Sequence, residues 1–187
     1  MRMIKIACAL TLTSLLPQLA QAGVVWAANG HEYELVNSEG VTWVNANAAA
    51  TRAGWYLATV TSAAEHNFIV ANILSGGSTT DRSHYWIGGT DAELEGDFRW
   101  VNGDAWGYTN WWAGEPNNLG NEDYVAYDYR NGWAWNDAPN DLGAQYGFSR
   151  GYLMERNLSP NVPEPATLGL LGLGLLAAGI ARRRRRH

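Results

Sequence analysis

The sequence predicts an α+β domain in which two helices precede several short antiparallel strands, flanked by terminal segments of a different composition. Helical periodicity between residues 42 and 74 supports this fold class, and so do the short aromatic runs separated by Gly, Asn and Asp after residue 84. All 10 tryptophans of the 187-residue chain lie in its middle part, where they can supply a core. We therefore divide the chain into residues 1–22, 23–158 and 159–187.

The N-terminal segment has the three parts of a secretory signal peptide. Arg2 and Lys5 precede an apolar run from Ile6 to Leu16, and Ala20-Gln21-Ala22 supplies the small residues that a signal peptidase needs at its cleavage site. A buried first helix is the alternative, but the three features occur together. We expect cleavage after Ala22 and export of the protein.

The domain is predicted to begin with a strand and an amphipathic helix. His31 to Val36 alternates enough to form a strand. Thr42 then opens an alanine-rich stretch that places Trp43, Ala46 and Ala50 on one helical face.

A second helix is predicted to follow the segment Leu57 to Val60. Ser62 and Glu65 have the S-x-x-E spacing of a capping box at its start. Apolar residues then recur at helical intervals up to about Leu74, namely Ala64, Phe68, Ile69, Ala71 and Ile73.

Short strands are predicted for the rest of the domain. The candidates are Trp86-Ile87, Phe98 to Val101, Tyr124 to Tyr129 and Tyr152 to Met154. The segment from Gly103 to Asp123 lacks sustained periodicity and is long for a loop in a compact domain, so it is either functional or disordered. Its tryptophans favour an ordered loop.

Removal of the terminal segments changes both the cysteine content and the charge. The single cysteine, Cys8, lies in the signal peptide, so the exported domain would fold without disulfides. Arg2, Lys5 and Arg182 to Arg186 also lie in the terminal segments, which leaves a strongly acidic middle. Such a body repels nucleic acid and anionic membranes and suits cations or neutral polar ligands.

Oxygen-bearing side chains gather in two stretches of the domain. Glu115-Pro116-Asn117-Asn118 is followed by Glu122-Asp123, and Trp135-Asn136-Asp137 comes later. Calcium takes about six to eight oxygen ligands in irregular geometry, which such side chains can supply. The stretches hold no His or Cys, which argues against zinc. The alternative is that these residues mark solvated turns.

Several motifs in order decide between these alternatives. The segment LATVTSAAEHNFI (Leu57 to Ile69) resembles the second-helix signature of the C-type lectin-like domain family, and Trp86-Ile87-Gly88-Gly89 resembles its WIG core strand. Glu115-Pro116-Asn117 and Trp135-Asn136-Asp137 resemble its EPN and WND calcium motifs. The resemblance covers about Val24 to Arg156. It implies a C-type lectin-like fold, with two helices packed on short antiparallel strands and a long calcium-binding loop.

The resemblance also implies a principal calcium site. Its ligands would be Glu115, Asn117, Glu122, Asn136 and Asp137, with the Asp137 carbonyl as a further ligand. The resemblance also implies a cis peptide before Pro116, a geometry that only X-Pro bonds adopt at modest cost.

An auxiliary calcium site is implied by Asp91 and Glu95, together with Glu122 and Asp123. Asn118 is a further candidate, although it stands where calcium-binding relatives often carry a carboxylate. The sequence departs from the family at its disulfides, because Tyr124, Ala138 and other residues replace the cysteines. Aromatic packing and calcium must then compensate for the missing crosslinks.

The implied ligand is a sugar bound directly through calcium. Glu115, Asn117, Glu122 and Asn136 would bind the carbohydrate as well as the ion, and the Glu-Pro-Asn order implies mannose-type rather than galactose-type ligands. Trp111 and Trp112 are expected to pack the loop, with stacking on a sugar as the alternative.

The C-terminal segment resembles a sorting signal. Val162-Pro163-Glu164-Pro165 is followed by an apolar run from Ala166 to Ala181 and then by Arg182 to Arg186, as in the PEP-CTERM signal of Gram-negative exopolysaccharide producers. The resemblance implies transient membrane association, processing by an exosortase-type enzyme, and release to the cell surface or matrix. A permanent anchor is the alternative, but the apolar run is shorter than the roughly 20 residues that span a bilayer.

The predicted function is calcium-dependent carbohydrate binding by an exported bacterial surface or matrix lectin, with glycans or exopolysaccharide as partners. A structural or protein-binding domain of the same fold is the alternative. A glycosidase would need two acids set apart from the calcium residues, and no such pair is evident. No nucleophile motif accompanies His31, His66 or His84, so no enzymatic activity is expected.

Overall fold

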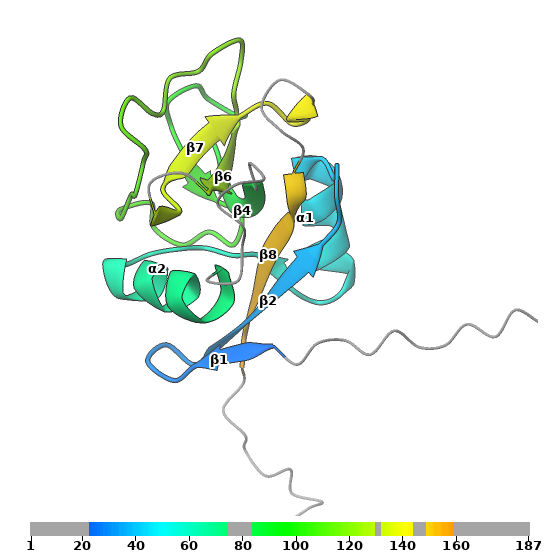
Figure 1. Ribbon diagram of the computed structural model, residues 1–187, viewed down its shortest axis with the longest axis vertical. Coiled ribbons are helices and arrows are strands. Elements are labelled where there is room, and N and C mark those ends of the chain that lie inside the picture. Colours follow the sequence, from blue (N-terminus) through cyan, green and yellow to red (C-terminus); the bar gives the residue numbers. More distant parts are fainter. Residues whose placement is uncertain (1–22, 75–83, 130–131, 144–148, 159–187) are drawn as a thin grey trace, which may run out of the picture.

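The computed structural model describes residues 23–74, 84–129, 132–143 and 149–158 (Figure 1). The predicted signal peptide and sorting tail lie outside the described residues. The helical elements are α1 (Trp43–Arg52), α2 (Ala63–Ile69) and the π-helical η1 (Val70–Leu74). The strands are β1 (Val24–Trp26), β2 (His31–Asn37), β3 (Tyr56–Leu57), β4 (His84–Thr90), β5 (Arg99–Trp100), β6 (Tyr124–Asp128), β7 (Trp135–Ala138) and β8 (Ser149–Asn157).

The strands form one mixed sheet in the order β1-β2-β8-β4-β6-β7, with β3 on β8 and β5 on β4. The last strand, β8, pairs antiparallel with β2 and parallel with β4. The prediction of purely antiparallel strands is therefore wrong at this pair. This parallel pairing could not be predicted from local sequence patterns, because β4 and β8 lie far apart in the sequence.

The predicted first helix is confirmed. The Thr42 side chain caps α1 by accepting a hydrogen bond from the Asn45 backbone N–H at 3.3 Å. Trp43, Ala46 and Ala50 are buried, and the Trp43 indole N–H donates to the Ile87 carbonyl at 2.8 Å. The helix therefore covers β4 with the face that its periodicity predicts.

The second helix begins after Ser62 as predicted, and its helical course reaches Leu74 as α2 followed by the π-helical η1. The Ser62 hydroxyl accepts from the Glu65 backbone N–H at 3.2 Å, as a capping box requires. The Glu65 carboxylate, however, accepts from the Thr61 N–H at 2.8 Å instead of the Ser62 N–H. The reciprocal half of the predicted box is therefore wrong, because Glu65 turns into the interior and contacts β2.

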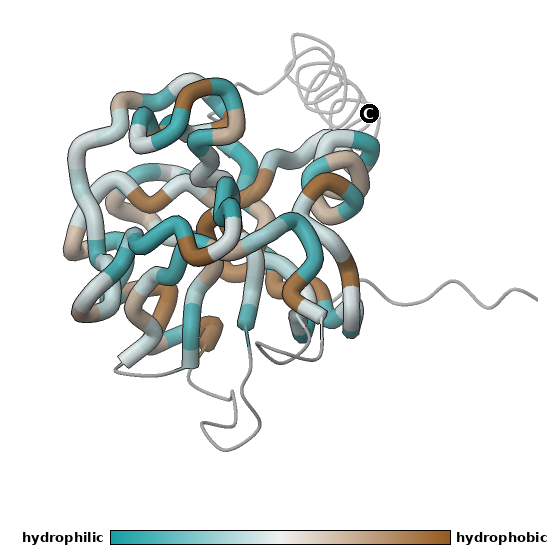
Figure 2. Tube along the Cα trace, turned by 90° about the horizontal axis from the view of Figure 1, so that it is seen from above, coloured by the Kyte–Doolittle hydropathy of each residue, from teal (hydrophilic) through white to brown (hydrophobic). Residues whose placement is uncertain are grey.

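Aromatic rings dominate one of the two clusters that make up the core. The Trp100 and Trp106 ring centroids lie 4.5 Å apart, and the fully buried Trp135 meets Trp100 edge-on at 5.6 Å. Figure 2 shows apolar stretches running through the packed elements, with polar residues prevailing on outer loops. Such aromatic area supplies much of the core that a domain without disulfides needs.

Gly88 allows the central strand β4 to approach β3 closely. A Cβ atom at this position would lie 2.5 Å from the Leu57 carbonyl oxygen. Only glycine fits this contact, which explains the glycine of the WIG motif in physical terms.

Candidate calcium and carbohydrate site

The long loop between β5 and β6 is irregular but tied to β7. Trp111 forms an isolated bridge with Trp135. The Trp112 N–H donates to the Trp135 carbonyl at 2.8 Å, and the Trp135 N–H donates to the Asn110 carbonyl at 2.7 Å. These bonds bring the Glu-Pro-Asn loop beside the strand that carries Asn136 and Asp137. β7 and the neighbouring loops lie at the top of Figure 1.

The Trp111 side chain packs the loop, as expected. Its ring lies 5.8 Å from the Trp135 ring at an interplanar angle of 87°, and 5.0 Å from the Phe98 ring. The loop therefore rests on the aromatic core through the Trp111 ring.

Asp137 is the hub of the principal site. Its carboxylate is buried and accepts hydrogen bonds from two consecutive backbone N–H groups, from Asn117 at 3.2 Å and from Asn118 at 2.8 Å. The Glu115–Pro116 peptide immediately before them is cis, as expected. Asn118 has a positive φ of 48°, which belongs to the tight turn that follows.

A second set of backbone bonds gathers the other predicted ligands. The Leu119 N–H donates both to the Asn117 side-chain oxygen and to the Glu122 carboxylate, each at 2.8 Å. The Glu122 N–H in turn donates to the Asn118 side-chain oxygen at 2.7 Å. Asn117 and Glu122 thus lie in one hydrogen-bonded turn, which is bonded to Asp137 on β7.

The two remaining predicted ligands adjoin this turn. The Asn136 side-chain amide donates to the Asp137 carbonyl at 2.5 Å, and Asn136 is buried on β7. The Glu115 N–H donates to the Trp112 carbonyl at 2.9 Å, which fixes the start of the cis turn.

The auxiliary residues surround Asp91, which is 2% exposed. One Asp91 carboxylate oxygen accepts from the Gly96 N–H at 2.8 Å, whereas the other is buried without a hydrogen-bond partner among the described residues. The Asp91 backbone N–H donates to the Asp123 carbonyl at 3.1 Å, which joins this group to the start of β6.

Negative charge accumulates around these residues. Burial raises the pKa of Asp91, and the carboxylates of Asp123 and Asp137 raise it further. The pKa of the exposed Glu95 is also raised, first by desolvation and then by the charges of Asp91, Asp123 and Asp137. The four carboxylates therefore share one region of unfavourable like-charge interaction.

The donor set fits a hard divalent cation. Every candidate ligand offers oxygen, one buried Asp91 oxygen has no hydrogen-bond partner within the described part of the chain, and the neighbouring carboxylates repel one another. Calcium prefers such oxygen ligands and tolerates the irregular geometry of loops. The residues present are therefore compatible with the calcium sites that the sequence implies.

Residues 39–143 match the family model of the lectin C-type domain, more than half of the chain. The chain belongs to the C-type lectin domain family. This family consists of lectins rather than enzymes, which agrees with the expectation that the chain catalyses no reaction. Residues 161–186 of this C-type lectin match the PEP-CTERM protein-sorting motif, which indicates export by a sorting system.

Individual C-type lectins are similar to this chain over the domain. A perlucin-like protein from Mytilus galloprovincialis is 36% identical over 100 residues, which cover 53% of this chain and 63% of the relative. Lectin BRA-3 from Megabalanus rosa is 36% identical over 113 residues, with 58% and 64% covered. The chain therefore spans less than two thirds of these relatives.

Solved structures confirm the fold. The C-type lectin CEL-I from Cucumaria echinata superposes with a TM-score of 0.59 at 30% identity, covering 67% of this chain and 89% of CEL-I. The two helices and mixed sheet are those of a C-type lectin. No helix in the described ranges is long and apolar enough to cross a membrane.

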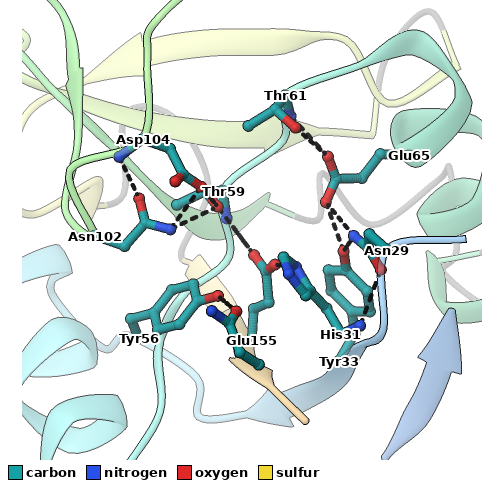
Figure 3. Close-up of polar contacts among 11 residues, drawn as sticks. Asn29, His31, Tyr33, Tyr56, Thr59, Thr61, Glu65, Asn102, Asp104 and Glu155 are labelled. Carbon is teal, nitrogen blue, oxygen red and sulfur yellow. Dashed lines mark hydrogen bonds and ion pairs between the residues drawn. The ribbon is translucent and has the colours of Figure 1, made fainter. Parts of the chain in front are cut away.

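One polar cluster of this C-type lectin escaped the sequence analysis. His31, Glu65 and Glu155 bring ligand-type atoms within 4.8 Å of one another (Figure 3). We call these three residues the base cluster. They come from β2, α2 and β8, so no local spacing connects them. The one feature of the sequence that could have indicated this cluster is Glu155, a glutamate directly after the apolar Leu153-Met154 of the last strand.

Proposed function

We propose that this C-type lectin binds sugars through calcium held by the turn after Pro116 and by β7. The observation that carries the proposal is that the Leu119 N–H joins the Asn117 and Glu122 side-chain oxygens, while the Asp137 carboxylate accepts from the N–H groups of the same turn. Backbone N–H groups thereby position side-chain oxygens from two separate motifs, which favours a pre-organised oxygen site over a set of independent solvated turns.

Five side chains would hold the principal ion: Glu115, Asn117, Glu122, Asn136 and Asp137. A bound calcium ion would supply coordination positions for the lone pairs of two adjacent sugar hydroxyls. The carboxylates of Glu115 and Glu122 would accept hydrogen bonds from the sugar hydroxyls, and the amides of Asn117 and Asn136 would donate hydrogen bonds to the hydroxyl oxygens. Each polar group then has a partner.

An auxiliary ion is proposed beside Asp91, with Glu95, Glu122 and Asp123 as further ligands. The buried Asp91 oxygen without a hydrogen-bond partner supports this assignment. The role we propose for this second ion is structural, because it would neutralise the repulsion that otherwise acts between the loop and the start of β6.

The proposed ligands are mannose-type sugars on glycans or exopolysaccharide. This preference rests on the Glu-Pro-Asn order at residues 115–117. A shallow polar site of this kind binds a monosaccharide at about millimolar affinity, near 4 kcal/mol, so strong adhesion needs many copies. Display on a bacterial surface or matrix, after transient membrane association and removal of the tail, would supply those copies.

Calcium titration of the chelated protein, followed by a glycan array with and without calcium, tests the proposal. We expect calcium binding and calcium-dependent retention of mannose-type glycans. Calcium binding without retention of any glycan would instead favour the alternative, a structural or protein-binding domain.

A further inference from the structure

The base cluster lies at the end of the domain away from the proposed calcium site. His31 begins β2, and Glu155 lies near the end of β8, where Figure 1 shows these strands beside β1 at the bottom of the molecule. Glu65 reaches the same place from α2. The cluster therefore joins three elements that are far apart in the sequence.

Glu65 is buried and fully engaged by neutral donors. One carboxylate oxygen accepts from the Tyr33 hydroxyl at 2.5 Å and from the Asn29 amide at 3.3 Å (Figure 3). The other accepts from the Thr61 N–H at 2.8 Å and from the Thr61 hydroxyl at 2.9 Å. These hydrogen bonds give both carboxylate oxygens partners but bring no positive charge.

Glu155 is fully buried and depends on His31. One of its oxygens accepts from the Thr59 N–H at 2.8 Å and contacts the Thr59 hydroxyl at 3.2 Å. The other contacts the His31 imidazole Nδ1 directly. His31 is 24% exposed, so this ring connects the buried carboxylate with solvent.

One bound proton halves the negative charge of the cluster, which is otherwise that of two carboxylates beside a neutral imidazole. Two buried carboxylates face one imidazole, and an uncompensated buried charge is costly. Burial is the largest cause that raises the pKa of Glu155, to about 7, and the charge of Glu65 adds to it, while the Thr59 N–H and His31 act in the opposite direction.

Neighbouring tyrosines, an aspartate and an arginine do not offset the negative charge of Glu65 and Glu155. Burial raises the pKa of each tyrosine nearby, so these phenols stay neutral. Asp104 contacts the Thr59 hydroxyl at 3.3 Å and adds negative charge, and Arg156 pairs with Glu32 at the surface. The tyrosines are Tyr33 on β2, Tyr56 on β3 and Tyr127 on β6.

We propose that the base cluster is a proton-dependent latch, in which one proton shared between the His31 imidazole and the Glu155 carboxylate holds β2, α2 and β8 together. Loss of this proton at alkaline pH leaves Glu65 and Glu155 as uncompensated buried anions. The base of the domain then loosens without any change in the calcium loop.

The sign of the pH dependence follows from the raised pKa of Glu155. A folded-state pKa of about 7 exceeds the ordinary value of 4.5, so the stabilisation is complete below pH 4.5 and is lost as the pH rises through 7. Between pH 6 and pH 8.5 this one group raises the unfolding equilibrium constant by about tenfold. Calcium binding has the opposite pH dependence. It weakens as the pH falls, because the carboxylate ligands must be deprotonated to bind the ion.

Thermal and denaturant unfolding of the full chain in chelator, between pH 6 and pH 8.5, tests the latch. Glu155→Gln keeps the shape and the bond to Thr59 but removes the titrating group, so its unfolding constant should lack the tenfold rise. His31→Gln, at a partly exposed position, removes an interaction that lowers the pKa of Glu155, so its unfolding constant should rise more than tenfold over the same pH range. Glu39→Gln, an exposed acid outside the cluster, should behave as wild type at every pH.

Subtraction of each variant from wild type removes the contributions of the calcium-loop carboxylates, which are common to all four proteins. The proposal would be overturned if the unfolding constant changed with pH in the same way for wild type, His31→Gln and Glu155→Gln. If Glu155→Gln does not fold, a His31→Gln profile that stays parallel to wild type would overturn it equally.

Discussion

Asp137 shows how single residues organise the proposed site. Its buried carboxylate accepts from the Asn117 and Asn118 N–H groups, so the cis turn and β7 are held together by one side chain. Removal of such a buried acceptor costs about 1–3 kcal/mol, because the donors lose their partner. Asp137 is therefore expected to matter for folding of the loop as well as for calcium.

Exchange of the carboxylate and amide at two ligand positions tests sugar selection. Glu115→Gln with Asn117→Asp preserves one carboxylate and one amide, so calcium should stay bound while donor and acceptor change sides. Binding should shift from mannose-type toward galactose-type monosaccharides, as measured by competition against an immobilised glycan. An unchanged preference, with calcium still bound, would show that these residues do not select the sugar.

Among the elements, β6 and β7 carry two residues, Tyr124 and Ala138, that the family resemblance implies stand in place of cysteines. Tyr124 and Ala138 are direct cross-strand partners, and the Tyr124 ring packs on Trp43 at 4.6 Å. The strand pairing and this aromatic contact hold the two positions together without a covalent bond.

We expect that a disulfide can be introduced between positions 124 and 138. Tyr124→Cys with Ala138→Cys is expected to form a disulfide, and closing a loop of about 15 residues stabilises by about 3 kcal/mol. The stability of the oxidised variant, measured by denaturant unfolding, should exceed that of the same variant after reduction. This comparison cancels the lost Tyr124 packing. Equal stability of the two forms would mean that the strands do not hold this register.

The sequence predicted the helices better than the sheet. Trp43, Ala46 and Ala50 repeat with helical spacing, and that local signal was sufficient for α1. β1, β3 and β7 are too short to show periodicity. The residues Asn136 and Asp137 of β7 indicated a calcium motif and gave no sign of a strand. The parallel pairing of β4 with β8 depends on contacts between distant segments.

The candidate site was predictable in its members but not in its construction. The motifs identify Asn117 and Asp137 by residue type and order, and the resemblance to the EPN motif implied the cis peptide before Pro116. The backbone N–H of Leu119, which joins Asn117 to Glu122, carries no signal in the sequence because any residue except proline supplies it. The base cluster was invisible for a related reason, since its three residues meet only in the folded chain.

For the molecule as a whole, calcium should act as a stabilising ligand. Acidic residues repel one another in the loop, so binding to the folded state alone should add about 2.7 kcal/mol at a hundredfold excess over the dissociation constant. Thermal unfolding with and without chelator measures the effect. Superimposable melting curves at saturating calcium would count against both proposed ion sites.

Processing at both termini is a second prediction for the whole chain. The exported protein should begin near Gly23 and end close to Val162-Pro163-Glu164-Pro165, because both terminal segments have the composition of removable signals. Intact mass of the protein from its native host measures this. A cell-bound chain that retains Arg182 to Arg186 would instead indicate a permanent anchor.

Calorimetric titration of methyl α-mannoside into the protein tests the central claim most directly. We expect binding at about millimolar affinity in calcium, no heat of binding in chelator, and no binding by Asn136→Ala or Asp137→Ala. Asp141→Ala, an exposed acid outside the ligand set, should bind as wild type. Sugar binding that persists in chelator, or that survives in Asn136→Ala, would contradict calcium-dependent recognition at this loop.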